Sequence, residues 1–133
     1  MRPTKDEYFF QIAKVVASRS TCIRRKYGAV IVKDNQIIST GYNGSASGLQ
    51  NCCDTGICSR EMFNVPHGER YELCEAVHAE MNAIIQAGRL AKDSDLYLVG
   101  LENEAEINAE PCSLCKRVII NAGIKNVHVK KFM

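Results

Sequence analysis

The chain has 133 residues and a formal net charge of +2, so it fits one domain with a modest core, and its charge favours neither a nucleic-acid nor a membrane partner. Its first residues lack the apolar core of a secretory signal peptide, and no apolar run is long enough to span a bilayer. Seven cysteines are many for this length, but their odd number and the missing signal favour reduced thiols or metal ligands in a cytoplasmic protein.

The first part of the chain predicts one helix and two strands. Residues 6–18 carry apolar side chains at helical spacing and predict a helix. Residues 28–33 form a β-branched apolar run, residues 34–35 a two-residue turn, and residues 36–42 a returning strand. Residues 43–73 have little periodicity and contain several cysteines, so they predict a functional or cross-linked insertion loop within a single domain spanning residues 1–133.

The middle of the chain predicts a second helix and a third strand. Residues 77–87 predict a helix that Gly88 ends. Its apolar stripe is expected to consist of Met81, Ile84 and Ile85. Residues 96–100 predict a buried strand, and residues 101–110 are polar and predict a loop.

The last part predicts a third helix and a fourth strand. Pro111 opens the helix, and Gly123 ends it. Residues 126–130 predict a short terminal strand. Strands that alternate with helices predict an α/β fold, with a sheet between two helical layers in a three-layer α-β-α sandwich.

The sharpest chemical signal is His78 and Glu80, followed by Pro111, Cys112 and Cys115. One imidazole and two thiolates supply three zinc ligands and leave the fourth tetrahedral position to water, as in a catalytic zinc site. Cys112 and Cys115 are three residues apart at a helix start, where both sulfurs face one way and the helix dipole favours thiolate. We therefore expect two helix N-termini to converge on one metal ion.

A carboxylate beside such an ion can move protons to and from the water. Glu80 would take the proton of that water and later deliver it to a ring nitrogen and the leaving amine. The expected chemistry is attack of hydroxide on an amidine-like carbon with loss of ammonia. Two alternatives remain: packed thiols with a helix-capping histidine, and a closed structural zinc site that leaves Glu80 without a role.

These residues also match a known pattern, His-x-Glu followed by Pro-Cys-x-x-Cys, which is that of zinc deaminases. Across residues 1–130 the chain resembles the deoxycytidylate (dCMP) deaminase branch of the cytidine deaminase superfamily. The runs that carry the resemblance are residues 19–22, 27–33, 40–44 (Thr-Gly-Tyr-Asn-Gly), 68–74, 77–85 and 111–125. The zinc motif marks the superfamily, and the Gly-Tyr-Asn-Gly run with Asn82 narrows it to this branch.

The resemblance implies a cytidine deaminase-like sandwich with a central mixed sheet. It also implies that His78, Cys112 and Cys115 bind the catalytic zinc, that Glu80 is the proton shuttle and that Asn43 holds the deoxyribose. The implied reaction converts dCMP and water to dUMP and ammonia, which supplies thymidylate synthesis. Many members are homo-hexamers that dCTP, together with Mg²⁺, activates and dTTP inhibits near the Gly-Tyr-Asn-Gly run.

Members of the branch also tend to carry four further cysteines, which match Cys22, Cys52, Cys58 and Cys74. A second, structural zinc on these four thiolates would cross-link the insertion loop to the rest of the domain. Cys53 and His67 are substitute ligands, and reduced thiols that simply pack are the alternative. The branch often has proline where this chain has Ala46, and members usually continue beyond the position of Met133.

A nucleotide substrate needs further contacts. The phosphate candidates are Arg24, Arg25, Lys26 and Arg70. Tyr42 and Tyr71 could stack on a pyrimidine or pack in the core. We also expect Ala79 to contact the substrate and His128 to be structural or on the surface.

Three other functions compete with dCMP deamination. The first is deamination of a base in nucleic acid, such as a tRNA adenosine, which would call for a basic aromatic face. The second is deamination of a free nucleoside or a pterin-like compound. The third is a zinc-stabilised interaction module without enzymatic activity.

Overall fold

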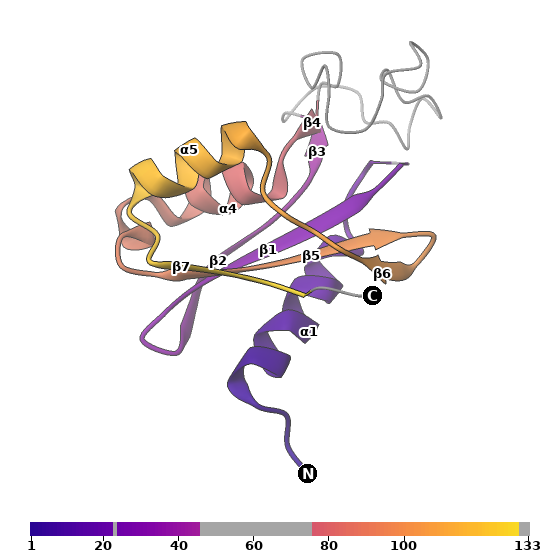
Figure 1. The fold of residues 1–133 in the computed structure, drawn as a ribbon, viewed down its shortest axis with the longest axis horizontal. Coiled ribbons are helices and arrows are strands. Elements are labelled where there is room, and N and C mark those ends of the chain that lie inside the picture. Colours follow the sequence, from indigo (N-terminus) through magenta and orange to yellow (C-terminus); the bar gives the residue numbers. More distant parts are fainter. Residues whose placement is uncertain (23, 46–75, 131–133) are drawn as a thin grey trace.

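The computed structural model describes residues 1–22, 24–45 and 76–130, which form a mixed sheet with helices on both sides (Figure 1). Five of the described strands make the main sheet: β1 (Lys26–Lys33), β2 (Gln36–Tyr42), β5 (Asp95–Glu102), β6 (Ala105–Ile107) and β7 (Asn126–Val129). A small separate sheet pairs β3 (Gly44–Ser45) with β4 (Ala76–Val77). The helices are α1 (Lys5–Ala17), α4 (Ala79–Ala87), the 3-10 helix η2 (Gly88–Ala91) and α5 (Ser113–Ala122).

The main sheet has the order β2-β1-β5, with β6 and β7 both pairing with β5. β2, β1, β5 and β6 pair antiparallel, whereas β7 runs parallel to β5. The predicted hairpin between β1 and β2 is present, and its turn residues Asp34 and Asn35 both have positive φ angles. The sheet is therefore mixed, as predicted.

α1 covers one face of the sheet (Figure 1). It starts with a capping box, in which the Thr4 side chain accepts from the Glu7 amide at 3.2 Å and the Thr4 amide donates to the Glu7 carboxylate at 3.4 Å. Its buried side chains pack on β1 and β5 in a cluster that contains Phe9, Ala13, Ala17, Val30, Val32, Tyr97, Val99 and Leu101. A Cβ at Gly28 would lie 2.1 Å from the carbonyl oxygen of Ala13, so only glycine allows this approach of α1 to β1.

α4 and α5 cover the opposite face (Figure 1). Their cluster contains Ala29, Ile31, Leu96 and Leu98 from the sheet and Ala79, Ala83, Cys115 and Ile119 from the two helices. A Cβ at Gly41 would lie 2.4 Å from the Ala83 nitrogen, so the backbone of α4 rests directly on β2. The helical layers on both faces confirm the predicted three-layer sandwich.

The structure corrects the prediction that residues 101–110 form a loop. β5 continues to Glu102, and residues 105–107 return as β6. Asn103 and Glu104 form the connecting turn and both have positive φ angles. The strand was missed because β6 is only three residues long and, among the described strands, pairs with β5 alone, so its side chains are too few to show an alternating apolar pattern.

The second helix also differs from its prediction. It begins at Ala79 rather than at residue 77, because Val77 pairs with Gly44 in the small sheet and His78 takes the N-cap position. The predicted apolar stripe is partly wrong, because Ile85 is 68% exposed. Apart from Glu80, the buried residues of α4 are alanines, and the backbone of Ala79 and Ala83 lies directly against Gly41 of β2. Most of the predicted insertion loop, residues 46–73, lies outside the described residues. No helix in the described part of the chain is both long and apolar enough to cross a membrane.

Candidate metal centre

Two helices begin at the same place on one face of the sheet. His78 is the N-cap residue of α4, and Cys112 is the N-cap residue of α5. Cys115 lies in the first turn of α5 and is fully buried. Figure 1 shows the starts of α4 and α5 at the end of the molecule where β1 begins and β2 ends. The structure therefore brings His78 next to Cys112 and Cys115, although Cys112 lies 34 residues further along the chain.

The donor atoms of these three residues have the spacing that a zinc ion requires. His78 Nδ1 lies 3.2 Å from Cys115 Sγ and 3.5 Å from Cys112 Sγ, and all three donor atoms lie within 4.8 Å of one another. Tetrahedral coordination with ordinary Zn–N and Zn–S bonds places its donors about 3.5–3.8 Å apart. The described residues thus bring together three candidate ligands for one metal ion.

The surroundings of the Cys115 thiol also favour a metal ion at this site. Burial raises the pKa of Cys115 far above its usual range, and the negative charges of Glu80 and Cys112 raise it further. At the start of α5, the amide of Cys115 donates to Cys112 Sγ at 3.4 Å. A buried thiol packed against a carboxylate loses its proton far more readily beside a cation, so Cys115 fits a ligand of a divalent metal.

Glu80 is the acidic neighbour of the three ligands. It lies in the first turn of α4 and is only 5% exposed. Burial raises the pKa of its carboxyl above the usual range, whereas hydrogen bonds with its own backbone and with Cys115 oppose part of that rise. A carboxyl that holds its proton more tightly than one in water is better suited to accept a proton from water and return it.

Asn43, the predicted deoxyribose contact, is 8% exposed and hydrogen-bonded within the protein. Its Oδ1 accepts from Ser20 Oγ at 2.6 Å and from the Tyr27 amide at 2.8 Å. Its Nδ2 donates to the Arg25 carbonyl at 2.9 Å. Sequence reasoning missed Ser20, because a single serine in a polar stretch carries no signal of burial.

The end of β2 is tied to the start of α4. Asn82 Nδ2 donates to the Tyr42 carbonyl at 2.8 Å, and Ser39 Oγ donates to the Ala83 carbonyl at 2.7 Å. Ala79, a predicted substrate contact, is fully buried, and its carbonyl lies against Gly41. The structure therefore places Tyr42 and Ala79 beside the first turn of the helix that carries His78 and Glu80.

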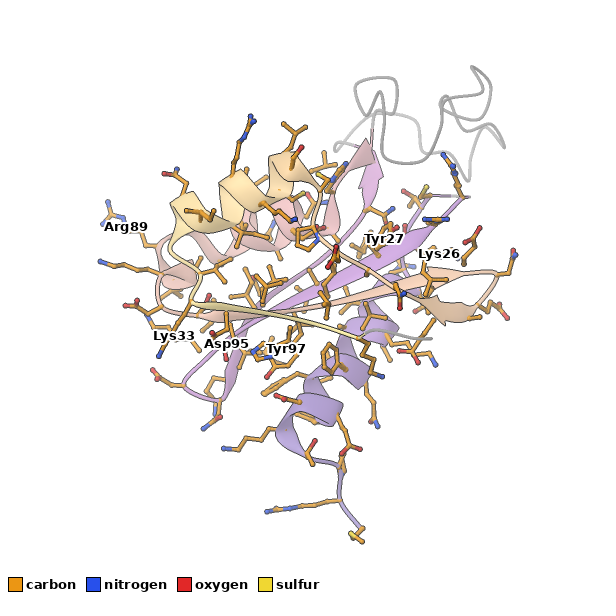
Figure 2. The ribbon with its side chains drawn as sticks, in the orientation of Figure 1. Lys26, Tyr27, Lys33, Arg89, Asp95 and Tyr97 are labelled. Carbon is orange, nitrogen blue, oxygen red and sulfur yellow. The ribbon has the colours of Figure 1, made fainter. Side chains whose placement is uncertain are left out.

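Three of the four predicted phosphate candidates, Arg24, Arg25 and Lys26, lie at or just before the start of β1. Figure 2 shows Lys26 and Tyr27 at the opposite end of the molecule from Lys33. Arg25 pairs with Glu102, with 3.3 Å between Nε and Oε2. Arg70 lies outside the described residues.

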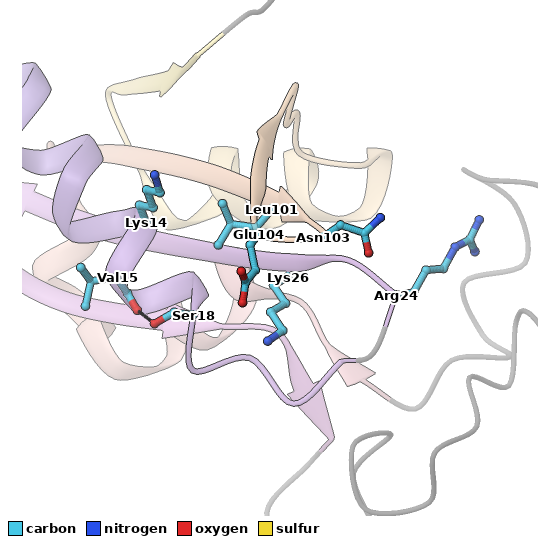
Figure 3. A pocket seen from close by; sticks show the side chains of 8 residues that line it. All are labelled: Lys14, Val15, Ser18, Arg24, Lys26, Leu101, Asn103 and Glu104. Carbon is cyan, nitrogen blue, oxygen red and sulfur yellow. Dashed lines mark hydrogen bonds between the residues drawn. The ribbon is translucent and has the colours of Figure 1, made fainter.

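Arg24 and Lys26 also line a groove of about 550 Å³ on the α1 side (Figure 3). Its other lining residues are Lys14, Val15, Ser18, Leu101, Asn103 and Glu104. Figure 3 shows Arg24 extending away from the remaining lining side chains. The lining residues of this groove do not include His78, Cys112 or Cys115.

The remaining candidates fall in two groups. Cys22 is buried with a free thiol, and the other proposed ligands of a second zinc, Cys52, Cys58, Cys74, Cys53 and His67, lie outside the described residues, as does Tyr71. His128 stacks on Tyr97 at a centroid distance of 4.3 Å and pairs with Asp95 at 3.3 Å. Tyr97 belongs to the α1 cluster, so His128 lies across the sheet from the metal centre.

Several known proteins are similar to this chain in sequence. The chain is 40% identical over 131 residues to the deoxycytidylate deaminase of Mycobacterium phage D29, which covers 95% of this chain and 94% of that protein. It is 37% identical over 128 residues to the deoxycytidylate deaminase of Schizosaccharomyces pombe, but this match spans 95% of the chain and only 37% of the yeast protein.

A solved structure and a family model extend the comparison. The structure of the dCMP deaminase from cyanophage S-TIM5 in complex with dCMP and dUMP matches with a TM-score of 0.65 and 26% identity, covering 96% of this chain and 85% of that one. The model of the cytidine and deoxycytidylate deaminase zinc-binding region matches residues 3–131. This match spans nearly the whole chain and includes the three ligands and Glu80, so the chain belongs to the cytidine and deoxycytidylate deaminase family.

Proposed function

We propose that this protein is a zinc-dependent deaminase that converts dCMP and water to dUMP and ammonia. The observation that carries the proposal is the convergence of one imidazole and two thiols beside a buried carboxyl, at the starts of α4 and α5. The names of the related phage and yeast proteins, and the dCMP and dUMP in the cyanophage complex, indicate the substrate.

His78, Cys112 and Cys115 would hold the zinc ion. When bound, zinc acts as a Lewis acid that lowers the pKa of water toward neutrality. Glu80 accepts a proton from the attacking water and gives it to the ring nitrogen. It then accepts the proton of the new hydroxyl at C4 and gives it to the leaving amine, so that the product keeps a C4 carbonyl. A C–O bond forms at C4 of the cytosine, the C–N bond breaks, and ammonia leaves.

A substrate panel tests the proposal. Ultraviolet absorbance would be followed with dCMP, CMP, deoxycytidine and dCTP, while the zinc content of the same sample is measured. We expect dCMP to be the preferred substrate and each active chain to hold its catalytic zinc. A zinc-loaded, folded protein that leaves all four compounds unchanged would overturn the proposal, whereas preference for deoxycytidine would overturn only the nucleotide part.

A second, structural zinc is a separate part of the proposal. Cys22 is buried as a free thiol, and the cysteine-rich insertion supplies Cys52, Cys58 and Cys74 in the same chain. Such a site would order the insertion within a single domain of residues 1–133 rather than take part in the chemistry. We expect two zinc ions per chain, and one in the variant C22S.

Assembly and regulation are proposed from the family alone. The protein would be a cytoplasmic homo-hexamer, activated by dCTP with Mg²⁺ and inhibited by dTTP near Asn43. Light scattering coupled to size exclusion would give the assembly. Titration of dCMP turnover with each triphosphate, with and without Mg²⁺, would test the regulation.

A further inference from the structure

Ser20 is a buried serine whose hydroxyl joins two segments of the chain. It is 7% exposed, and its Oγ lies 2.6 Å from Asn43 Oδ1 and 2.7 Å from the Asn43 carbonyl oxygen. The same Oγ accepts from the Cys22 amide at 3.2 Å. This hydroxyl therefore fixes both the backbone and the side chain of Asn43 against the segment that follows α1.

Asn43 in turn binds the backbone on both sides of Lys26, at the end of a basic turn that we define as Arg24, Arg25 and Lys26. Its Nδ2 donates to the carbonyl of Arg25, and its Oδ1 accepts from the amide of Tyr27. Both bonds, at 2.9 and 2.8 Å, join the Asn43 side chain to backbone atoms of the neighbouring segment. They therefore fix the backbone path of the turn rather than the position of one side chain. The amide of Asn43 adds a third bond, to the Tyr27 carbonyl at 3.3 Å.

The residue before Asn43 is bound to the helix of the metal centre. Asn82, in the first turn of α4, donates to the carbonyl of Tyr42 at 2.8 Å. Adjacent residues at the end of β2 thus hold the catalytic helix on one side and the basic turn on the other. The position of the turn relative to Glu80 follows from this short chain of hydrogen bonds.

We propose that Ser20 is a positioning residue which, acting through Asn43, holds the basic turn where its guanidinium groups bind the 5′-phosphate of the nucleotide. The inference rests on the proposed function. Guanidinium groups bind phosphate through paired hydrogen bonds whose strength depends on orientation, so a displaced turn loses much of that binding. Arg24 and Lys26 both line the groove on the α1 side, so the groove does not distinguish them. We assign the phosphate to Arg24 and Arg25 because only a guanidinium group offers the paired donors that match phosphate oxygens.

The first test is the variant S20A, with dCMP and deoxycytidine as substrates. Loss of the hydroxyl leaves buried groups of Asn43 and Cys22 unpaired, so we expect the KM for dCMP to rise about tenfold or more. The kcat for dCMP should stay within about twofold, because the metal centre is unchanged, and an interaction that only binds substrate changes KM. Turnover of deoxycytidine, which has no phosphate, should fall much less than turnover of dCMP at low substrate concentration, because it can lose only the deoxyribose contact expected of Asn43.

The matched control is S94A. Ser94 is also buried, at 1% exposed, and its hydroxyl also donates to a backbone carbonyl, that of Ala91 at 2.5 Å. It lies between η2 and β5, away from the basic turn. S94A should lower the melting temperature in the manner of S20A and leave the KM for dCMP unchanged.

A double-mutant cycle separates the positioning role from general loosening of the site. If Ser20 acts through the turn, S20A raises KM no further in the background R24A/R25A. An equal rise in both backgrounds would contradict the proposal, as would a KM unchanged in S20A or a parallel loss with both substrates. Absence of dCMP turnover in the wild type would instead overturn the proposed function, and this inference with it.

Discussion

Each residue of the metal centre depends on its position at a helix start. His78 and Cys112 have the extended backbone of N-cap residues, which turns their side chains toward the space in front of the two helices. Glu80 lies two residues into α4 and is buried beside Cys115. The sequence predicted all four of these residues, because a metal site demands particular residue types at fixed spacing.

The first prediction concerns the ligand Cys115. The variant C115A removes one of three donors, so its affinity for zinc should fall strongly. The loss should exceed the roughly 10- to 100-fold that is typical when a residue hydrogen-bonded to a metal ligand is replaced. A competition titration with a coloured chelator measures this affinity. The control is I119V, a change at another buried residue on the same helix, which removes packing but no donor. Equal zinc affinity in C115A and I119V would exclude Cys115 as a ligand.

The second prediction concerns Tyr97, on the other face of the sheet. Burial raises the pKa of Tyr97 above its usual range, and its hydrogen bond to Asp6 and the negative charges of Asp6 and Asp95 raise it further. The folded protein therefore keeps this proton at a pH where the unfolded chain loses it. Stability should thus fall as the pH rises above about 10, the ordinary tyrosine value.

Urea unfolding between neutral pH and pH values above 10 measures this effect. The variant Y97F has no hydroxyl to titrate, so its unfolding free energy should fall less steeply across the same pH range. The zinc content of Y97F should match the wild type, because Tyr97 packs under α1. An identical slope in both proteins would exclude Tyr97 as the source of the alkaline loss.

At the scale of elements, the site depends on how closely α4 lies on β2. Small residues in both elements permit this approach, and they were hard to recognise in the sequence, because alanine and glycine carry little hydrophobic signal. The apolar pattern therefore pointed to Ile85, which is exposed. The hairpin turn at Asp34 and Asn35 was predictable because local turn chemistry decides it.

The third prediction compares two glycines on opposite faces. A Cβ at Gly41 would lie 2.5 Å from the Ala79 carbonyl, and a Cβ at Gly28 would lie 2.1 Å from the Ala13 carbonyl. Both G41A and G28A should lower the unfolding free energy, by about 1–3 kcal/mol as overpacking does. G41A displaces the helix that carries His78 and Glu80, so it alone should also reduce kcat per folded, zinc-loaded molecule.

Chemical denaturation and single-turnover assays on both variants measure these effects. G28A is the control, because it crowds the layer opposite the metal centre. If G28A reduced kcat as much as G41A, the approach of α4 to β2 would not be what positions the site.

At the scale of the whole molecule, the two faces of the sheet differ in what covers them and in whether they carry the metal centre. α1 closes one face with an aromatic cluster, and α4 and α5 close the other and present the metal centre. Alternating helices and strands were sufficient to predict this layering. The edge strand β6 was not predictable, because its existence depends on pairing with β5 across the β5–β6 turn rather than on its own side chains.

The fourth prediction concerns removal of metal from the whole protein. Zinc that binds the folded chain stabilises it, so a strong chelator should lower the melting temperature, and added Zn²⁺ should restore it. Differential scanning calorimetry measures the change. The variant C115A should show a smaller chelator effect than the wild type, and an equal effect in both would mean that the stabilising metal is bound elsewhere.

The central claim is that Glu80 moves the protons for a hydrolysis that takes place at the three ligands. Its most direct test is dCMP turnover by E80Q, measured with the zinc content of the same sample. The amide keeps the shape of the side chain but cannot carry the proton, so we expect a folded, zinc-loaded protein whose kcat falls by at least about 10²-fold. Turnover of dCMP by zinc-loaded E80Q at the wild-type rate would contradict this account.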